Sequence, residues 1–206
     1  MKVHHVEVAP IGTNCYVGVN EKTNEAVVVD PGGSPELIIG LLKQLNVQVK
    51  AIFLTHGHMD HIGALNEIKE YTGAKVYVSK EDAPMLKNPQ SSLAAFFGTD
   101  LVCPDPDKFY GQGDEVTEAG MTFKVLATPG HTPGGVCLHS GDVVFCGDTI
   151  FCESVGRTDF PGGSYKQLLQ SIKEKLLILD DKTKLLPGHG PSTTVDWEKR
   201  RNPFLQ

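Results

Sequence analysis

The segment THGHMDH, residues 55–61, places three histidines and one aspartate within six positions, directly after the apolar run AIFL. The four side chains are His56, His58, Asp60 and His61. Imidazoles packed this closely would repel one another if protonated, whereas a metal ion binds neutral imidazoles through their lone pairs. A single ion cannot readily accept all four donors at bond lengths of roughly 2.0–2.2 Å, but two ions could. The spacing therefore predicts a site for two metal ions.

Three more side chains of the metal-binding type follow apolar runs elsewhere. His131 comes after FKVLATPG, Asp148 after VVFCG, and His189 after KLLPG. A strand end is a rigid base for a ligand because the sheet already fixes its backbone. Histidine and carboxylate donors are typical of catalytic sites, while structural zinc usually favours cysteine-rich sites. A catalytic centre is thus expected, with a purely structural metal as the alternative.

Short β-branched runs that stop at Gly, Pro or Asp predict the strands that position these residues. The expected strands cover residues 2–8, 15–19, 25–30, 50–55, 74–79, 121–130, 135–140, 142–148 and 183–188. They come in two batches, and helical patterns follow each batch. This order predicts two β-sheets packed face to face with helices outside.

Helical periodicity predicts the outer layers. One helix is expected to have Ser34 as its N-cap, Pro35 at its first position, and an apolar face of Leu37, Ile38, Leu41, Leu42 and Leu45. A second is expected from Ser164, its cap, to about residue 179, with an apolar stripe of Leu168, Leu169, Ile172, Leu176 and Leu177. Further helices are expected at residues 61–73, ending at Gly73, at residues 80–87, and near Trp197.

Residues 88–114 are expected to be irregular, because turns such as CPDPD and GQGD interrupt them. A long loop inside a compact domain is typically a lid or a binding loop. Its aromatic residues, Phe96, Phe97, Phe109 and Tyr110, could serve an interface instead.

Composition describes an ordinary globular chain. The 206 residues, 40% hydrophobic and 21% charged, suit one domain over residues 1–206. The net charge of −6 argues against a nucleic-acid partner, since phosphate binding needs concentrated Lys and Arg. No apolar stretch approaches the roughly 20 residues of a membrane span, and the first residues do not form a secretion signal. Five cysteines without a C-x-x-C pair indicate reduced thiols, so a cytoplasmic location is expected.

Five motifs in order resemble the metallo-β-lactamase superfamily over essentially the whole chain. They are VVVDPGG (27–33), THGHMDH (55–61), PGHTPGG (129–135), CGDTIF (146–151) and PGHGPST (187–193). The resemblance implies an α/β fold, an αβ/βα four-layer sandwich of two mixed sheets flanked by helices, with a dinuclear site at one rim.

The same resemblance implies a role for each motif residue. His56, His58 and His131 would bind the first metal, Asp60, His61 and His189 the second, and Asp148 would bridge the two. Asp30 would support the ligand loops through hydrogen bonds without being a ligand itself. Two divalent ions per chain are expected, zinc first, with iron or manganese also compatible with these donors.

Two further stretches, TNCY (13–16) and GRTDFPGG (156–163), resemble the glyoxalase II-type enzymes, the hydroxyacylglutathione hydrolases. Glyoxalase II proper has a C-terminal helical domain that binds glutathione, but this chain ends 17 residues after His189. The resemblance therefore implies a thioester hydrolase whose thiol is not specified. GRTDF also resembles the persulfide dioxygenases, which use one iron on part of the same ligand set.

The expected chemistry is attack on a thioester by a hydroxide that bridges two metal ions, with Asp60 orienting the nucleophile or accepting its proton. A thiolate leaves without a general acid, which favours a thioester over an amide. Two divalent ions outweigh two carboxylates and one hydroxide, so the site should attract an anionic substrate. Arg157 and Lys166 are the candidates for binding its carboxylate, and ordinary surface charges or an ion pair are the alternative.

Three other functions stay open on the sequence. One is persulfide dioxygenation, and another is a different hydrolysis within the superfamily, by a lactonase or a lactamase-like enzyme. Secreted lactamases would need an export signal, and RNA-processing members would need a basic surface. The third is a metal-binding or protein-interaction module without activity.

Overall fold

Two six-stranded β-sheets face each other in the computed structural model, which describes residues 1–206. The first sheet has the order β1-β2-β3-β4-β5-β6: β1 (Lys2–Val8), β2 (Thr13–Asn20), β3 (Glu25–Val29), β4 (Gln48–Phe53), β5 (Lys75–Ser79) and β6 (Lys108–Tyr110). Its strands are antiparallel from β1 to β3 and parallel from β3 to β6.

The second sheet has the order β14-β13-β10-β9-β8-β7. Its strands are β7 (Glu115–Glu118), β8 (Met121–Ala127), β9 (Val136–Ser140), β10 (Val143–Gly147), β13 (Lys184–Pro187) and β14 (Thr193–Thr194). Only β10 and β13 pair in parallel. A short ribbon, β11 (Ile150–Phe151) and β12 (Ser154–Val155), follows β10. Both sheets are therefore mixed, as the sequence predicts.

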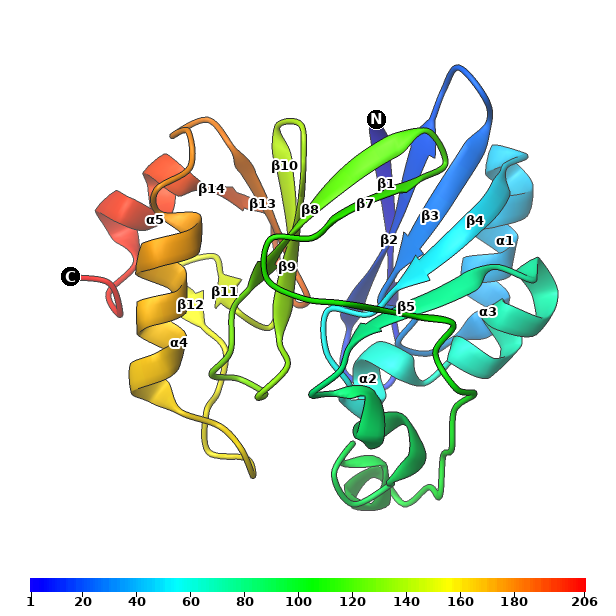
Figure 1. Cartoon of the computed structure of the whole chain (residues 1–206), viewed down its shortest axis with the longest axis horizontal. Helices are drawn as coiled ribbons and strands as arrows, with labels where there is room; N and C mark the ends of the chain where they lie inside the picture. The colour runs from blue at the N-terminus through cyan, green and yellow to red at the C-terminus, as the bar shows by residue number, and fades with distance from the viewer.

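Helices form the two outer layers (Figure 1). α1 (Pro35–Leu45) and α3 (Leu65–Thr72) cover the first sheet. α4 (Tyr165–Ser171), which continues into the π-helical turn η3 (Ile172–Leu176), and α5 (Val195–Arg201) cover the second. The short helix α2 (Met59–Ile62) and the 3-10 helices η1 (Ala83–Lys87) and η2 (Ala94–Phe97) lie at one end of the first sheet. The four-layer sandwich expected from the sequence is confirmed.

The core between the sheets is aromatic. The ring of Phe53 on β4 packs edge-on against Tyr77 at 5.2 Å and against Phe123 of the opposite sheet at 5.0 Å, measured between ring centroids. The neighbouring Ile52 points to the other face of the same strand and packs under the helices. The second half of β4 is buried on both faces, so its sequence there, residues 51–53, is a continuous apolar run, whereas Gln48 and Lys50 at its start are not buried.

The prediction of one continuous helix over residues 61–73 is wrong, because the structure has two helices there, α2 and α3. A Cβ atom on Gly63 would lie 2.3 Å from the carbonyl oxygen of Gly32, and the N–H of Ala64 donates to Pro31 at 2.9 Å. The segment after β3 therefore packs against residues 63 and 64, and the N–H of Ala64 donates to this segment instead of to the preceding helical turn. The end at Gly73 is as expected, with a left-handed φ of 65°.

Two details of α1 also differ from expectation. Ser34 makes no capping hydrogen bond, since its hydroxyl accepts from the N–H of Ala9 at 3.1 Å. Leu37 is 49% exposed, whereas Ile38 and Leu42 are buried under the helix. By contrast, Ser164 caps α4 as expected by accepting from the N–H of Gln167.

The expectation that residues 88–114 are irregular is only partly correct. They contain η2, and β6 pairs in parallel with β5 to form the edge of the first sheet. Tyr110 on β6 is buried and its hydroxyl donates to the carbonyl of Leu54. Ser92 accepts from the N–H of Met59 at 2.7 Å, so this segment packs beside α2. Phe96 is 86% exposed.

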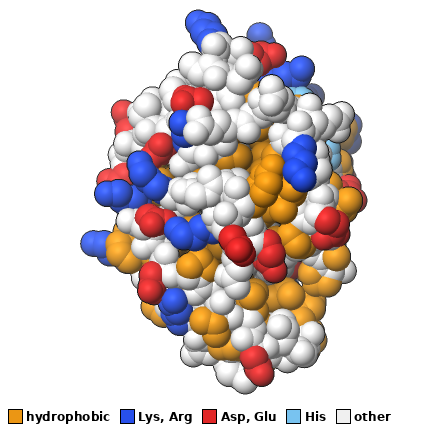
Figure 2. Space-filling view, turned by 90° about the vertical axis from the view of Figure 1, so that its right-hand side faces the viewer, with side chains coloured by type: hydrophobic (Ala, Val, Ile, Leu, Met, Phe, Trp, Pro, Cys, Tyr) orange, Lys and Arg blue, Asp and Glu red, His pale blue; other side chains and the backbone are white.

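The face formed by α1, α3 and neighbouring loops carries interspersed acidic and basic side chains, with hydrophobic side chains gathered between them (Figure 2). All five cysteines are free thiols. None of the helices combines the length and hydropathy that a membrane span requires.

We expect Phe53→Ala to destabilise the fold by about 3–5 kcal/mol, because it removes a buried ring between the two sheets. Phe96→Ala removes an equally large ring from the surface and should change the free energy of unfolding by less than about 0.5 kcal/mol. Chemical denaturation of both variants measures the difference. Similar losses in the two variants would contradict this description of the core.

Candidate metal centre

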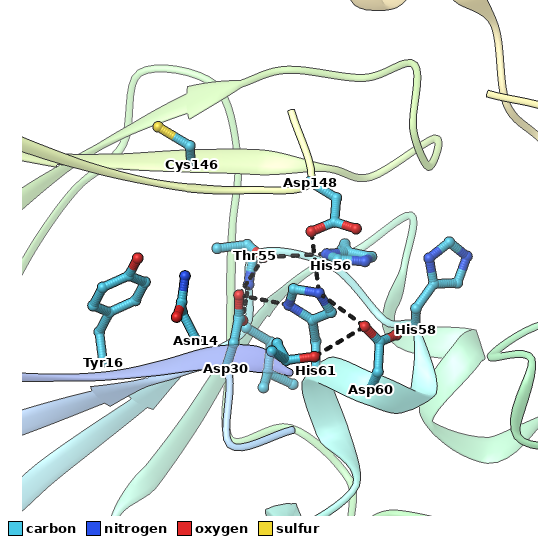
Figure 3. Close-up of polar contacts among 12 residues, drawn as sticks. Asn14, Tyr16, Asp30, Thr55, His56, His58, Asp60, His61, Cys146 and Asp148 are labelled. Carbon is cyan, nitrogen blue, oxygen red and sulfur yellow. Dashed lines mark hydrogen bonds and ion pairs between the residues drawn. The ribbon is translucent and has the colours of Figure 1, made fainter. Parts of the chain in front are cut away.

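Four strands of the two sheets end at the same rim, and each delivers one histidine or aspartate to it. His56 follows β4, His131 follows β8, Asp148 follows β10, and His189 follows β13. Figure 3 shows two of them, His56 and Asp148, approaching each other from the two sheets. Two backbone hydrogen bonds align the strand ends, from the N–H of Val136 to the carbonyl of Thr55 (2.9 Å) and from Gly188 to Gly147 (2.8 Å).

His56, His58 and His131 form what we call the first ligand group. Their ring nitrogens lie within 4.8 Å of one another, and all three residues are buried. The Nδ1 atom of His58 is 2.9 Å from the Nε2 atom of His131. The three rings stand nearly perpendicular to one another, at 84–89°. This arrangement directs three lone pairs to one point.

Asp60, His61 and His189 form the second ligand group, also within 4.8 Å. The Oδ2 atom of Asp60 is 3.1 Å from Nε2 of His189 and 3.4 Å from Nε2 of His61. Asp60 and His61 come from α2, whereas His189 comes from the opposite sheet. The second group is thus assembled across the sandwich, as is the first.

Asp148 lies between the two groups. Its Oδ2 atom is 3.6 Å from Nε2 of His131 and 3.5 Å from Nε2 of His189, and its Oδ1 atom is 3.2 Å from Nε2 of His61. The structure therefore brings together all seven side chains that the sequence nominates as ligands.

Three atoms at this point are buried and make no hydrogen bond: Nε2 of His56, and Nε2 of His61 and Oδ1 of Asp148, which face each other at 3.2 Å. A buried polar atom left unpaired destabilises a fold by about 1–3 kcal/mol. Each of the three is a lone-pair donor of a type that divalent cations accept. The unpaired atoms fit a divalent metal site at the centre of the cluster.

Asp30 is a buried carboxylate behind the ligands. Its Oδ1 atom accepts from the N–H of Thr55 (2.7 Å), and its Oδ2 atom accepts from the Thr55 hydroxyl (2.6 Å). Oδ2 is also 2.9 Å from Nδ1 of His61. A proton on Nδ1 leaves Nε2 of His61 free to face Asp60 and Asp148, which is the usual support for a metal-binding histidine.

A second buried carboxylate, Asp82, was not singled out from the sequence. It accepts hydrogen bonds from the N–H of Gly57 (3.2 Å), the hydroxyl of Thr132 (2.7 Å) and the N–H of Gly134 (2.8 Å). Burial raises the pKa of Asp82, although these three hydrogen bonds act to lower it. The surrounding stretch KEDAPM has no histidine and no metal-ligand spacing, so no local signal marks it.

The TNCY stretch contacts the loop that carries His189. The side chain of Asn14 donates to the carbonyls of Pro187 (3.0 Å) and Gly190 (2.9 Å), and its N–H donates to Gly188 (2.7 Å). The hydroxyl of Tyr16 also donates to Pro187, at 2.8 Å. These contacts explain in physical terms why the buried strand β2 begins with polar residues.

Thr13 and Gly188 complete the surroundings of the second ligand group. The hydroxyl of Thr13 donates to Oδ2 of Asp60 at 3.1 Å. A Cβ atom on Gly188 would lie 2.3 Å from Oδ1 of Asp148 and 2.7 Å from the His61 ring. Only glycine allows the chain before His189 to pass this close to the ligands.

Neither of the two residues nominated for substrate binding lies within the cluster. The guanidinium of Arg157 forms a bidentate pair with Asp159 (2.8 and 2.7 Å) and covers the ring of Phe160 at 4.0 Å. The carbonyl of Arg157, rather than its charge, reaches the site, where it lies 2.7 Å from Nδ1 of His131. Lys166 is an exposed residue of α4 and forms no ion pair.

Two aromatic rings that the sequence analysis does not nominate, those of Phe160 and Phe151, lie beside the ligands. The centroid of Phe160 is 5.5 Å from that of His58, and the centroid of Phe151 is 5.9 Å from that of His189. Each ligand group therefore has one half-buried aromatic neighbour.

The two groups differ in their protonation in the metal-free protein. Burial lowers the pKa of His56 well below that of an ordinary histidine, and burial with the nearby His131 lowers the pKa of His58 to about 3. Burial also opposes charge on His61, but the carboxylates of Asp60, Asp148 and Asp30 raise its pKa well above the usual value. Against burial, Asp148 and Asp60 raise the pKa of His189 to about 9.

Residues 8–189 match the family model described as the metallo-beta-lactamase superfamily, so the chain belongs to this superfamily. Hydroxyacylglutathione hydrolase GloC from Haemophilus influenzae is 38% identical over 209 residues, and the alignment covers 100% of this chain and 98% of that protein. The resemblance that the motifs indicated is therefore confirmed.

Solved structures agree with this assignment. The crystal structure of the BLEG-1 B3 metallo-beta-lactamase is 37% identical and superimposes with a TM-score of 0.96 over 100% of both chains. TTHA1623 in a di-iron-bound form is 36% identical with a TM-score of 0.85, over 98% of this chain and 100% of that one. ETHE1 from Myxococcus xanthus is 31% identical with a TM-score of 0.81, over 98% of this chain and 84% of that one.

We expect metal binding at neutral pH to release a proton from His189, because its pKa of about 9 keeps it protonated in the metal-free protein while coordination requires the neutral ring. Metal affinity should therefore weaken as the pH falls. Calorimetric titration in buffers of different ionisation enthalpy counts the protons released.

His189→Ala should release about one proton fewer per chain than the wild type. His58→Ala is the matched comparison, since a pKa of about 3 means that His58 has no proton to lose at neutral pH. An unchanged proton count in His189→Ala would contradict the electrostatic description of the second group.

Proposed function

We propose that this chain is a metal-dependent hydrolase of thioesters, of the hydroxyacylglutathione type. The observation that carries the proposal is the presence of two ligand groups with Asp148 between them. Within each group the donor atoms lie within 4.8 Å of one another, a spacing that suits a metal ion. A one-metal chemistry would not require both groups to converge.

We assign His56, His58 and His131 to one metal ion, Asp60, His61 and His189 to the other, and Asp148 to both. Imidazole and carboxylate donors suit zinc, iron and manganese alike. Zinc is the ion we expect first, and the relative TTHA1623 holds two irons. Asp30 acts through His61 and Thr55 without contacting a metal.

When bound, two divalent ions supply a hydroxide at neutral pH and stabilise the negative charge that develops on the carbonyl oxygen. Asp60 is the residue we assign to orienting the nucleophile and accepting its proton. Its Oδ2 atom faces the space between His61 and His189, and the Thr13 hydroxyl fixes its direction. Burial shields this carboxylate from bulk water, which strengthens its interactions.

The need for a proton donor distinguishes the leaving groups that this site could release. An amine needs a proton in order to leave, whereas a thiolate, with a parent pKa of about 8.5, does not. Arg157, whose guanidinium keeps its proton, is paired with Asp159, and Lys166 is exposed on α4, so neither side chain lies in the cluster to protonate a leaving group. The site is therefore better suited to a thioester than to an amide.

The substrate's two ends would meet different surroundings. Phe160 and Phe151 offer apolar contact beside the first and second ligand groups respectively. An anionic thiol half suits the positive charge that two divalent ions bring to the rim. Arg157 could leave Asp159 and pair with a substrate carboxylate instead, because the side chains of Arg157 and Asp159 are both exposed to solvent. The similarity to GloC makes a glutathione thioester the first substrate to test.

The decisive experiment is a substrate panel on the purified, metal-analysed protein: lactoylglutathione, acyl-CoA, bacillithiol and alkyl thioesters, a lactone, a β-lactam and a persulfide. We expect two metal ions per chain and hydrolysis of thioesters that a chelator abolishes. Oxygen consumption with the persulfide would replace the proposal with a dioxygenase. Turnover confined to the lactone or β-lactam would move it to another hydrolase, and no turnover would favour a binding module.

We expect His58→Ala to lower thioesterase activity by at least about 100-fold, because it removes one of three donors of the first ligand group. The fold should persist, since His58 lies at the rim and not in the core between the sheets. His139→Ala, at a histidine outside the cluster, is the control and should retain activity. Wild-type activity in His58→Ala would overturn the ligand assignment.

A further inference from the structure

We propose that two separate hydrogen-bonded bridges position the two ligand groups: Asp82 positions the first, and Asn14 positions the second. Each bridge joins a segment of the first sheet to a segment of the second at one side of the rim. Each should therefore determine the affinity for one metal ion and leave the other nearly unchanged. The inference rests on the two-metal site of the proposed function.

The Asp82 bridge consists of Asp82 with Gly57, Thr132 and Gly134. Asp82 and Gly57 belong to the half built on the first sheet, and the other two residues follow β8 of the second sheet. Gly57 lies between His56 and His58, and Thr132 follows His131 directly. One carboxylate thus connects the turn that carries two donors of the first group to the turn that carries the third.

The fit around Asp82 is close. The carboxylate uses both oxygens, Oδ1 for Gly134 and Oδ2 for Thr132 and Gly57. A Cβ atom on Gly134 would lie 2.6 Å from Oδ1 of Asp82 and 2.2 Å from the Ser79 hydroxyl. An amide at position 82 could accept with only one oxygen and would turn a donor toward a donor. This connection lies beside the two turns whose His58 and His131 ring nitrogens approach within 2.9 Å.

The Asn14 bridge joins Asn14 on β2 to Pro187, the last residue of β13, and to Gly190 in the turn that follows. Both bonds are donated by the side-chain amide to carbonyls on either side of His189. The amide oxygen is buried without a partner, so the side chain's polar contribution comes from those two bonds. This bridge fixes the one ligand of the second group that does not come from α2.

The bridges share no residue, and neither contacts the other ligand group. Residues that orient metal ligands without touching the metal typically change metal affinity by about 10- to 100-fold when removed. A residue that merely stabilised the fold would weaken both metal positions together. Selectivity between positions is therefore the property that identifies a positioning residue here.

The test measures zinc affinity in two backgrounds that each retain one ligand group. His189→Ala keeps the first group, and His58→Ala keeps the second. Zinc is titrated against a chromophoric chelator, with occupancy checked by native mass spectrometry, so that no enzymatic activity is needed. Asp82→Asn and Asn14→Ala are introduced separately into each background.

We expect Asp82→Asn to raise the zinc dissociation constant about 10- to 100-fold in the His189→Ala background and less than about 3-fold in the His58→Ala background. Asn14→Ala should show the opposite selectivity. It should raise the zinc dissociation constant about 10- to 100-fold in the His58→Ala background, which retains His189, and less than about 3-fold in the His189→Ala background. Asp107→Asn removes another carboxylate that accepts a backbone N–H, but far from the cluster at the β5–β6 edge, and should change neither constant.

Equal effects of Asp82→Asn in both backgrounds, or none in either, would overturn the inference while leaving the proposed function intact. Absence of zinc binding in the wild-type chain would overturn both. Circular dichroism establishes that each variant folds. If Asp82→Asn does not, Thr132→Val removes one of the three bonds and should shift affinity in the same background by a smaller factor.

Discussion

The hydrogen bonds between Asp30 and Thr55 determine how the two halves of the site can meet. Thr55 donates twice to the buried carboxylate, while its carbonyl accepts from Val136 of the second sheet. The same carboxylate orients His61. Asp30 has a left-handed backbone, with φ of 52°, a conformation that aspartate tolerates better than most residues. Backbone conformation and carboxylate chemistry therefore both call for aspartate at this position, and a change there would disturb the ligands of both sheets together.

The cluster is unfavourable without a cation, and this links metal binding to folding. Nε2 of His56, Nε2 of His61 and Oδ1 of Asp148 are buried there without a hydrogen bond. The aromatic core and the sheet hydrogen bonds must keep them together against that cost. A bound ion would supply the missing partner to each, and its binding free energy would add to the stability of the folded state. The sandwich thus positions the site, and the occupied site in turn should stabilise the rim of the sandwich.

The parts that the sequence predicts are those that local pattern encodes. Most strands, the layer order and the clustered side chains could be identified from local sequence. His56, His131, Asp148 and His189 each come after an apolar run, and the three remaining donors share the segment THGHMDH with His56. Features that depend on contact between distant segments could not. The interruption of the helix at Gly63 arises from the approach of Gly32, and β6 is a strand only because β5 offers it an edge. Asp82 has no motif around it, since its partners are 25 to 52 positions away.

Related proteins with different names share this fold, so the fold alone does not specify the substrate. BLEG-1 and GloC are both about equally similar to this chain. Seven inward-facing donors define what can be bound between the sheets, whereas the segments around the rim define what can approach. Here those segments present Phe160, with Arg157 stacked on it, on one side and the exposed Phe96 of η2 at the end of the first sheet. We therefore expect the residues of these two loops to select the substrate, while the buried carboxylates Asp30 and Asp82 hold the donors of the proposed two-metal site in place.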